Sequence, residues 1–461
     1  MDLATTNVVA TGVIAIVVGG VVLLAMVRYD LGPRGRLARG GQWLLATALG
    51  TGILAFAFKL LMIVAVVQAP EVMIAPLIAK AQIPPPPPAK DPFYGAFESR
   101  RYVWQPLPAP GAAEPAVQTD YVWQALPTAA PVPADNPMSA EKIALGERLF
   151  FDPNLSRDRK SSCATCHQVR EGSGADGRAT SVGIDGQIGQ RNAPTVWNAA
   201  FQSVLFWDGR SASLEEQAKG PLVNPVEMGM PSLAAVEERV KADAGYRESF
   251  AEVFPGQPIT IDRIVQAIAA YERTLITPDT PYDRFVRGDL EALTPAQLRG
   301  MGLFQSLGCV TCHSGPNFSA ASQFDGKAPL RIFPAFPVPY EERYRLTEDS
   351  GAAPKGSGRG LWRVPSLRNV ALTGPYFHNG SVTDLAEAVR VMASSELGRT
   401  GRYLVWSPRT ASLTRLDKPA LSDREVDDIV AFLHALTSDS LAEQVKRWNA
   451  QREEITYASS Q

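Results

Sequence analysis

All four cysteines of this 461-residue chain lie in two copies of one short pattern. The copies read Cys163-Ala-Thr-Cys166-His167 and Cys309-Val-Thr-Cys312-His313. The spacing Cys-X-X-Cys-His is typical of covalent c-type haem attachment, in which two thiols form thioether bonds to the porphyrin and the adjacent histidine ligates the iron. No cysteine is left over for a disulfide. We therefore expect a fold built around two haem groups.

Two other kinds of site use paired cysteines, namely a structural zinc site and a thioredoxin-like redox pair. A zinc ribbon places its Cys-X-X-Cys elements about 15–20 residues apart, whereas more than a hundred residues separate the two copies here. Each copy also carries its own histidine directly after the second cysteine. This spacing favours haem attachment over both alternatives.

Composition sets the size class and excludes one group of functions. The length allows two or three domains, and a 45% share of hydrophobic residues supplies ample material for a buried core. The formal net charge is only −2, so the chain lacks the broad basic face that phosphate binding needs. We expect no nucleic-acid partner.

Residues 1–70 contain two uncharged stretches, 3–27 and 40–58, each long enough to cross a bilayer. The short loop between them is rich in arginine, with Arg28, Arg34, Arg36 and Arg39. The positive-inside rule places such a loop in the cytoplasm, so both ends of the chain face outward. Covalent c-type haem is assembled outside the bacterial inner membrane, which demands the same topology. We predict two transmembrane helices in the inner membrane, with the haem domains in the periplasm.

Residues 71–137 form a Pro/Ala-rich tract, which predicts a semi-rigid linker. Two stretches within it, RYVWQPLPAP and DYVWQALPTA, form a short imperfect repeat. Their aromatic residues either dock on the folded part of the chain or on a partner, or belong to a plain tether. The sequence leaves these alternatives open.

From about residue 138 onward the pattern predicts helices joined by long glycine-bearing loops, so the fold class is mainly α. Thr294 and Gln297 fit a capping box on the helix that leads into the second Cys-X-X-Cys-His copy. Ser422 and Glu425 fit another on a later helix with an apolar stripe. Short helices around such a motif enclose the haem in small cytochromes c. We predict two cytochrome c-like haem domains, residues 138–290 and 291–461.

The histidines are few enough to be counted as ligands. The chain has four, and His167 and His313 belong to the attachment motifs, which leaves His378 and His434. No other histidine accompanies His167 between residues 139 and 290. The first haem therefore has no distal histidine from its own domain, and the only soft alternatives there are Met228 and Met230. An open iron binds small oxidants, whereas a closed one only passes electrons.

The region from about Leu145 to Thr437 resembles the bacterial dihaem cytochrome c peroxidases. That family is related to the dihaem enzymes that mature a tryptophan-derived quinone. The matching stretches occur in the family's order: GERLFFDPNLS, CATCH, RNAPTVWNAAF, FWDGR, QAKGPLVNPVEMG, TLITPDTPYDRF, CVTCH, VPSLRNVALTGPYFHNGSV and LSDREVDDIVAFL. The resemblance does not extend to residues 1–137.

The resemblance implies that the first haem is the peroxidatic site and the second receives electrons. Glu227, in NPVEMG, matches the distal acid and base that moves a proton between the two peroxide oxygens. Gln217 matches a distal polar neighbour. Trp207, in FWDGR, matches a tryptophan between the haems that is suited to relay electrons. Taken alone, Trp207 would be an ordinary packing residue.

The resemblance also assigns residues around the second haem. Met392 matches the methionine that ligates its iron opposite His313, which raises the reduction potential. His378 matches a histidine beside this haem that either bonds a propionate or shapes electron uptake, while His434 is interpreted as structural. Oxygen donors for a calcium ion between the domains match Asn192, Thr373 and Pro375.

Two features depart from the family pattern. Many members carry a distal histidine that blocks the first haem until the second is reduced, and Ile184 stands in its place. This predicts a first haem that is open even when fully oxidised. Residues 399–420 look inserted and basic. They either shape the docking of an electron donor or form a solvated loop.

The predicted function is a membrane-tethered periplasmic peroxidase that reduces hydrogen peroxide to water with electrons from a small cytochrome c or cupredoxin. One alternative is a dihaem enzyme that oxidatively modifies residues of a protein partner. Met392 speaks against it, because that branch has a tyrosine at this position. The other alternative is a non-catalytic electron carrier or haem sensor. Such a protein would have no use for Glu227 and Gln217. The oligomeric state is open, with a homodimer among the options.

Overall fold

The computed structural model describes residues 121–459, except for 325, 327, 337, 356–358, 400 and 408–411. All of these residues belong to one compact unit, Phe97–Gln461. The predicted transmembrane helices and residues 71–120 of the predicted linker lie outside the described residues. Among the residues described, no helix is long and apolar enough to cross a membrane.

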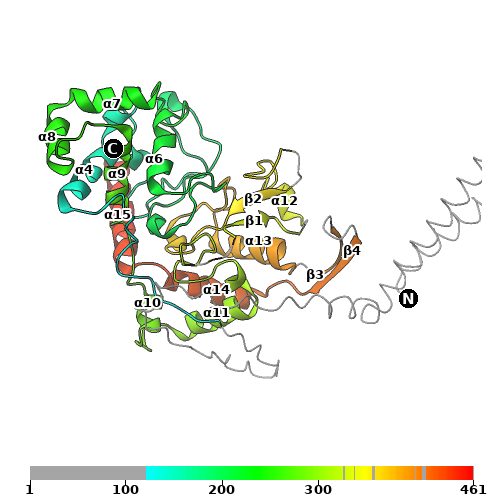
Figure 1. Ribbon diagram of the computed structural model, residues 1–461. Helices are drawn as coiled ribbons and strands as arrows, with labels where there is room; N and C mark the ends of the chain where they lie inside the picture. The colour runs from blue at the N-terminus through cyan, green and yellow to red at the C-terminus, as the bar shows by residue number, and fades with distance from the viewer. Residues whose placement is uncertain are drawn as a thin grey trace, which may run out of the picture. The chain divides into compact units, whose positions relative to one another are not determined.

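The described part of the chain is mainly helical, as the sequence predicts (Figure 1). Its amino-terminal half contains α4 (Ala140–Phe150), α5 (Cys163–Cys166), α6 (Leu214–Val223), α7 (Leu233–Ala242), α8 (Ala244–Val253), α9 (Ile261–Glu272) and α10 (Pro281–Val286). Short 3-10 turns are η2 (Pro153–Leu155), η3 (Ile184–Gly186), η4 (Ala199–Phe201), η5 (Cys309–Thr311) and η6 (Val370–Leu372).

The carboxyl-terminal half adds five helices and two small sheets. The helices are α11 (Pro295–Ser306), α12 (Tyr340–Arg343), α13 (Leu385–Leu397), α14 (Asp423–Ala435) and α15 (Asp439–Ser459). Two antiparallel strand pairs are β1 (Leu330–Phe333) with β2 (Gly360–Arg363), and β3 (Gly401–Ser407) with β4 (Ser412–Lys418). The pair β3–β4 lies within the predicted insertion, residues 399–420, with Gly401 opposite Lys418 in its register.

Both predicted capping boxes are confirmed. At the start of α11 the Thr294 hydroxyl accepts a hydrogen bond from the Gln297 N–H at 3.3 Å, and the Thr294 N–H donates to Gln297 Oε1 at 2.8 Å. Ser422 and Glu425 make the same reciprocal pair at the start of α14. These contacts satisfy N–H groups that the first turn of a helix cannot bond internally.

Each half has one close helix crossing, and a glycine makes each crossing possible. Helix α4 packs on α9, and a Cβ on Gly146 would lie 1.9 Å from the carbonyl oxygen of Ala267. Helix α11 packs on α14, and a Cβ on Gly300 would lie 1.8 Å from the carbonyl oxygen of Asp428. No side chain larger than hydrogen fits at either point. Each half therefore contains a helix pair that crosses closely at a glycine: α4 with α9 in the first half, and α11 with α14 in the second.

The end of the predicted linker is part of the folded unit. Trp123 is fully buried in the core formed by α10, α11 and α14, and its indole N–H donates to Gln305 Oε1 at 3.0 Å. Its ring packs against Tyr282 and Phe432. Of the alternatives that the sequence left open for the second aromatic repeat, the structure shows docking on the folded part.

The last helix, α15, returns to the amino-terminal half (Figure 1). The Gln444 amide donates to the carbonyl oxygens of Val169 and Arg170, at 3.1 and 2.6 Å. Gly172 approaches α15 closely, because a Cβ there would lie 2.7 Å from Val445 Cγ2. The contact holds the segment that directly follows the first attachment motif.

A fully buried ion pair ties four separate segments together. Arg368 and Asp283 are both 0% exposed and pair bidentately at 2.7 and 2.8 Å. Arg368 Nε also donates to the carbonyl oxygen of Pro316, and Asp283 accepts from the Leu126 N–H. Every charged atom of the pair is therefore paired inside the protein, which is the condition for burying an ion pair at tolerable cost.

Replacing Arg368 with Leu would leave the Asp283 carboxylate buried without its counter-charge. We expect the free energy of unfolding to fall by about 3–5 kcal/mol, measured by urea denaturation at neutral pH. The matched control is Arg345→Leu, which breaks the exposed pair with Glu348 and should leave the urea midpoint unchanged. Equal losses in the two variants would contradict this account.

Candidate active site

One continuous cavity of about 810 Å³ holds both attachment motifs, a volume within the usual range of cofactor pockets. The structure brings to its walls all fourteen residues that the sequence analysis singled out as ligands or catalytic groups. They are Cys163, Cys166, His167, Asn192, Trp207, Gln217, Glu227, Cys309, Cys312, His313, Thr373, Pro375, His378 and Met392. Their individual roles stay predictions, but they share one cavity.

In the first motif, the two thiols and the imidazole face the cavity as neutral groups. Burial raises the pKa of the Cys163 thiol to about 12 and that of Cys166 to about 11. Burial also lowers the pKa of His167, so its imidazole is neutral, as iron ligation requires. No group of three or more His, Cys, Asp or Glu side chains that could bind a metal occurs within the described ranges.

In the second motif, a backbone contact selects the tautomer of the proximal histidine. His313 Nδ1 lies 3.2 Å from the carbonyl oxygen of Phe318. A carbonyl only accepts hydrogen bonds, so Nδ1 carries the proton and Nε2 keeps its lone pair for a metal. Burial lowers the pKa of His313 to about 4, which keeps the ring neutral. This arrangement fits an axial haem ligand.

Met392 reaches the same cavity from α13. Asp384 caps the start of this helix, with its carboxylate accepting from the Glu387 N–H at 2.8 Å, and Gly398 caps its end in the left-handed conformation. Met392 packs beside a small apolar cluster that includes Val391 and Phe333. The helix therefore presents a thioether, a soft ligand, to the cavity that also contains His313.

Glu227 lies on a tight turn just after α6, the helix that carries Gln217. The Asn224 amide donates to Glu227 Oε1 at 2.7 Å and positions the carboxylate. Burial raises the pKa of Glu227, and the positive charge of Arg210 and the Asn224 hydrogen bond oppose this shift. A carboxyl with a raised pKa on the cavity that His167 also lines can accept and return a proton nearer to neutral pH than an exposed glutamate can.

All four histidines lie within the described residues, so the ligand count can be checked. His434 is exposed on α14, away from the cavity lining. Met230 packs in the apolar core of the first half, while Met228 belongs to that core and also reaches the cavity wall. Ile184 is 1% exposed and does not line the cavity, although its neighbours Gly183 and Ile188 do.

Trp207 is held by its backbone and by its ring nitrogen. The preceding residue, Phe206, has a positive φ of 63°, a strained conformation for a bulky residue, and the Arg210 guanidinium covers its ring at 3.4 Å. Trp207 Nε1 donates to the carbonyl oxygen of Asn192 at 2.8 Å. These contacts fix the indole at the cavity wall.

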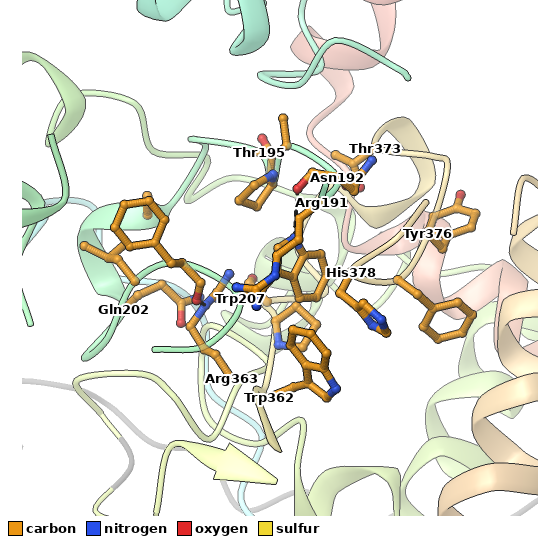
Figure 2. Close-up of a pocket in the computed structure, with 18 of the residues that line it drawn as sticks. Arg191, Asn192, Thr195, Gln202, Trp207, Trp362, Arg363, Thr373, Tyr376 and His378 are labelled. Atoms are coloured by element: carbon orange, nitrogen blue, oxygen red, sulfur yellow. Dashed lines mark hydrogen bonds between the residues drawn. The ribbon is translucent and has the colours of Figure 1, made fainter. Parts of the chain in front are cut away.

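Figure 2 shows Trp207, His378 and Trp362 gathered together. Trp362 stacks on His378 with ring centroids 4.0 Å apart, and Trp207 meets His378 edge-on at 6.5 Å. Sequence reasoning missed Trp362, although only one arginine separates it from the family stretch that begins VPSLRN. His378 Nε2 and Trp362 Nε1 are buried without a hydrogen-bond partner among the described residues. Two such donors at one wall fit the carboxylates of a haem.

The predicted calcium donors lie around one backbone contact. The Asn192 N–H donates to the carbonyl oxygen of His378 at 2.8 Å, which joins its segment to the one after Thr373 and Pro375. The Asn192 amide nitrogen donates to the carbonyl oxygen of Arg178, so the side-chain oxygen Oδ1 is the atom left to serve as a ligand. Oxygen donors of this kind suit calcium.

Comparison with known proteins gives the family. A sequence model described as di-haem cytochrome c peroxidase matches residues 140–291. The cytochrome c551 peroxidase of Pseudomonas aeruginosa is 40% identical over 305 residues, which cover 65% of this chain and 80% of that protein. This chain belongs to the dihaem cytochrome c peroxidase family. Membership confirms the prediction of two haem c groups and supports that of an oxidoreductase acting on peroxide.

Relatives of both functional branches are similar to the chain. Cytochrome c peroxidase Ccp of Escherichia coli K12 is 40% identical over 315 residues, which cover 66% of this chain but only 60% of that protein. Methylamine utilization protein MauG of Methylophilus methylotrophus is 33% identical, covering 68% of this chain and 88% of that protein. A solved MauG-like protein associated with microbial copper homeostasis superposes with a TM-score of 0.58 and is 32% identical. The match covers 68% of this chain and 95% of that chain.

The raised pKa of Glu227 predicts a pH dependence. If the carboxylate is the base, the reaction with peroxide speeds up as the pH rises through the pKa of Glu227, which lies above the ordinary glutamate value. Asn224→Ala removes a hydrogen bond that lowers this pKa, so the acidic limb should move to still higher pH. Glu227→Gln should abolish the limb and lower kcat/KM for peroxide by about 10²–10⁴-fold.

The matched control for Glu227→Gln is Glu216→Gln. Glu216 is an exposed carboxylate on α6 that pairs with Lys219, and its removal should leave kcat/KM and the pH profile unchanged. Stopped-flow spectroscopy of the haem-loaded protein across the pH range provides both quantities. An unmoved acidic limb in Asn224→Ala and Glu227→Gln would assign the limb to another group.

Proposed function

We propose that this chain reduces hydrogen peroxide to water with electrons from a small cytochrome c or cupredoxin. The observation that supports it most directly is the position of Glu227, a half-buried carboxyl with a raised pKa on the same cavity as His167. No second histidine of the first half shares that cavity in the described residues, so a small oxidant has room to approach. Family membership supports the same class of reaction.

In this proposal Cys163, Cys166 and His167 hold the first haem, and its iron supplies the redox chemistry of O–O cleavage. Glu227 accepts the proton of the peroxide oxygen that binds and gives it to the oxygen that leaves as water. Gln217, on α6, orients the peroxide by hydrogen bonding. Two electrons and two protons per peroxide complete the reduction to two waters. The protein thus contributes position and one proton carrier.

The second half of the site supplies the electrons. His313 and Met392 would hold the second haem with an imidazole and a thioether, a ligand pair that gives a relatively high reduction potential. Trp207 would relay electrons between the two haems. A calcium ion bound by Asn192 and by carbonyl oxygens of Thr373 and Pro375 would hold the first and second halves of the protein together near Trp207. The hydrogen bond from Trp207 Nε1 to the Asn192 carbonyl supports this coupling.

The proposed location is the periplasmic face of the inner membrane. Residues 3–27 and 40–58 would form the anchor, and the Pro/Ala-rich tract would place the haem domains at a distance from the bilayer. The uncharged length of both stretches and the arginine-rich loop between them support this arrangement.

The second candidate function is the oxidative modification of a protein partner. The similarity to MauG proteins favours it, and an accessible first haem fits it equally well. Met392 distinguishes the candidates, because a thioether ligand favours repeated electron uptake from a donor protein. The two functions share the reaction with peroxide and differ in where the electrons come from.

The test is peroxide-dependent oxidation of a reduced small cytochrome c by the full-length haem-loaded protein. One reaction starts from the fully oxidised protein and one from the half-reduced protein. We expect turnover without a lag from both. Turnover only after pre-reduction would show that another group closes the first haem. If the haems react with peroxide while the cytochrome stays reduced, the protein-modifying function is the better account.

Changing the proposed thioether ligand should separate the two haems. In Met392→Ala the reduction potential of the second haem should fall, and oxidation of the cytochrome donor should slow by at least about tenfold. The direct reaction of the first haem with peroxide should stay unchanged. A spectroscopic redox titration gives the potential. The control is Met301→Leu, a buried methionine of α11 outside the cavity lining, which should leave the potential where it is.

A further inference from the structure

The loop at residues 183–188 is packed directly against the turn that carries Glu227. The Ile184 N–H donates to the carbonyl oxygen of Glu227 at 3.1 Å, and the Gln187 amide donates to the carbonyl oxygen of Pro225 at 3.0 Å. At Gly183 the two backbones touch, since a Cβ there would lie 1.8 Å from the carbonyl oxygen of Val226. Loop and turn therefore form one backbone-to-backbone interface.

The Ile184 side chain fills a notch in this interface. It is 1% exposed, and its Cδ1 lies 2.1 Å from the point where a Cβ on Gly229 would be. Gly229 has a φ of +64°, so the turn uses a conformation that favours glycine, and the missing side chain leaves room for Ile184. A residue at position 184 thus points into the protein and away from the cavity, while Gly183 and Ile188 line it.

Further contacts hold the loop in this position. The Gly183 N–H donates to the carbonyl oxygen of Gln187 at 2.8 Å, which closes the loop on itself. Arg157 spans both parts, because its backbone N–H donates to the carbonyl oxygen of Met228 at 2.8 Å and its guanidinium pairs with Asp185. The apolar anchor at the centre of this polar frame is Ile184.

The turn itself is built around one asparagine. Asn224 accepts the Glu227 and Gly229 N–H groups on its carbonyl oxygen, at 3.2 and 2.8 Å, and donates to Glu227 Oε1. Asn224 holds Glu227 from one side and the 183–188 loop holds it from the other. The carboxyl position depends on both.

We propose that Ile184 is a positioning residue for Glu227. By filling the Gly229 notch it locks the loop onto the turn, fixes the Glu227 carboxyl at the cavity wall and keeps water from its backbone side. The same lock directs position 184 away from the first haem, so the openness of the site follows from the loop's direction as well as from the absence of an imidazole. The inference rests on the proposed role of Glu227 in peroxide reduction.

The packing of Ile184 against Gly229 should affect the pKa of Glu227. The charged group that faces Glu227 is Arg210, after Trp207. The Cys163 and Cys166 sulfurs of α5 also lie near it and would be uncharged thioethers in the haem-loaded protein. None of them contacts Ile184 in the interface described above. A smaller residue at 184 therefore changes the burial of Glu227 without removing a charge from its surroundings.

The test compares Ile184→Ala with Ile184→Val and with Ile264→Ala in the full-length haem-loaded protein. Ile264 is 0% exposed in the core of the same half and does not line the cavity, so its truncation deletes the same atoms elsewhere. The readouts are hydrogen exchange of residues 181–190 and 224–230, the rate of cyanide binding to the ferric protein, and the pH profile of kcat/KM for peroxide.

In Ile184→Ala we expect faster exchange in both segments, an acidic limb shifted toward the ordinary glutamate value, and kcat/KM lowered about tenfold. Cyanide binding should slow as well, because hydrogen cyanide must pass its proton to a distal base. Ile184→Val should stay within about twofold of the parent protein. Ile264→Ala should keep the exchange pattern of these segments and the pH profile.

Equal changes in Ile184→Ala and Ile264→Ala, or an unmoved exchange pattern and pH profile in Ile184→Ala, would overturn the proposal. If the parent protein does not turn over peroxide, the proposed function fails. The exchange and cyanide measurements then still decide whether Ile184 locks the loop onto the Glu227 turn.

Discussion

Two close backbone contacts determine where everything else in the described part of the chain lies. Gly146 lets α4 cross α9 and Gly300 lets α11 cross α14 without a side chain between them. Helix pairs at normal separation would be kept apart by their side chains, and the segments with the attachment motifs would shift with them. The two motifs line one cavity, and residues from distant segments meet on its walls.

Local signals in the sequence were sufficient for the parts of the structure that depend on local chemistry. The capping boxes at Thr294 and Ser422 follow from side chains three residues apart, and the attachment motifs follow from cysteine spacing. The docking of Trp123 on Gln305 joins residues 182 positions apart, and the stacking of Trp362 on His378 joins a strand to a loop 16 residues further along the chain. Such contacts depend on the tertiary arrangement of separate elements, which no local pattern records.

The cavity favours the neutral form of its cysteines, histidines and glutamates whose pKa values are shifted, whereas Arg191 stays charged through its pairs with Asp208 and Asp349. Burial raises the pKa values of the four-residue set Cys163, Cys166, Glu227 and Glu272, the last to about 8, and lowers those of His313 and His378 to about 4. An uncompensated charge is costly in such surroundings. Proton movements in this cavity must therefore accompany electron movements, and Glu227, with Arg210 nearby, is the carboxyl best placed for them.

Access of peroxide does not by itself distinguish the two candidate functions, because both would begin with a reaction of peroxide at the first haem. The difference lies in the wall that the two halves share. A thioether from α13 on the cavity that His313 also lines favours a second haem that accepts electrons repeatedly, and the Trp207, His378 and Trp362 rings lie together on the same cavity. A protein-modifying enzyme must instead draw electrons out of a partner through its surface. The described cavity concentrates its oxidisable rings inside, which favours the peroxidase.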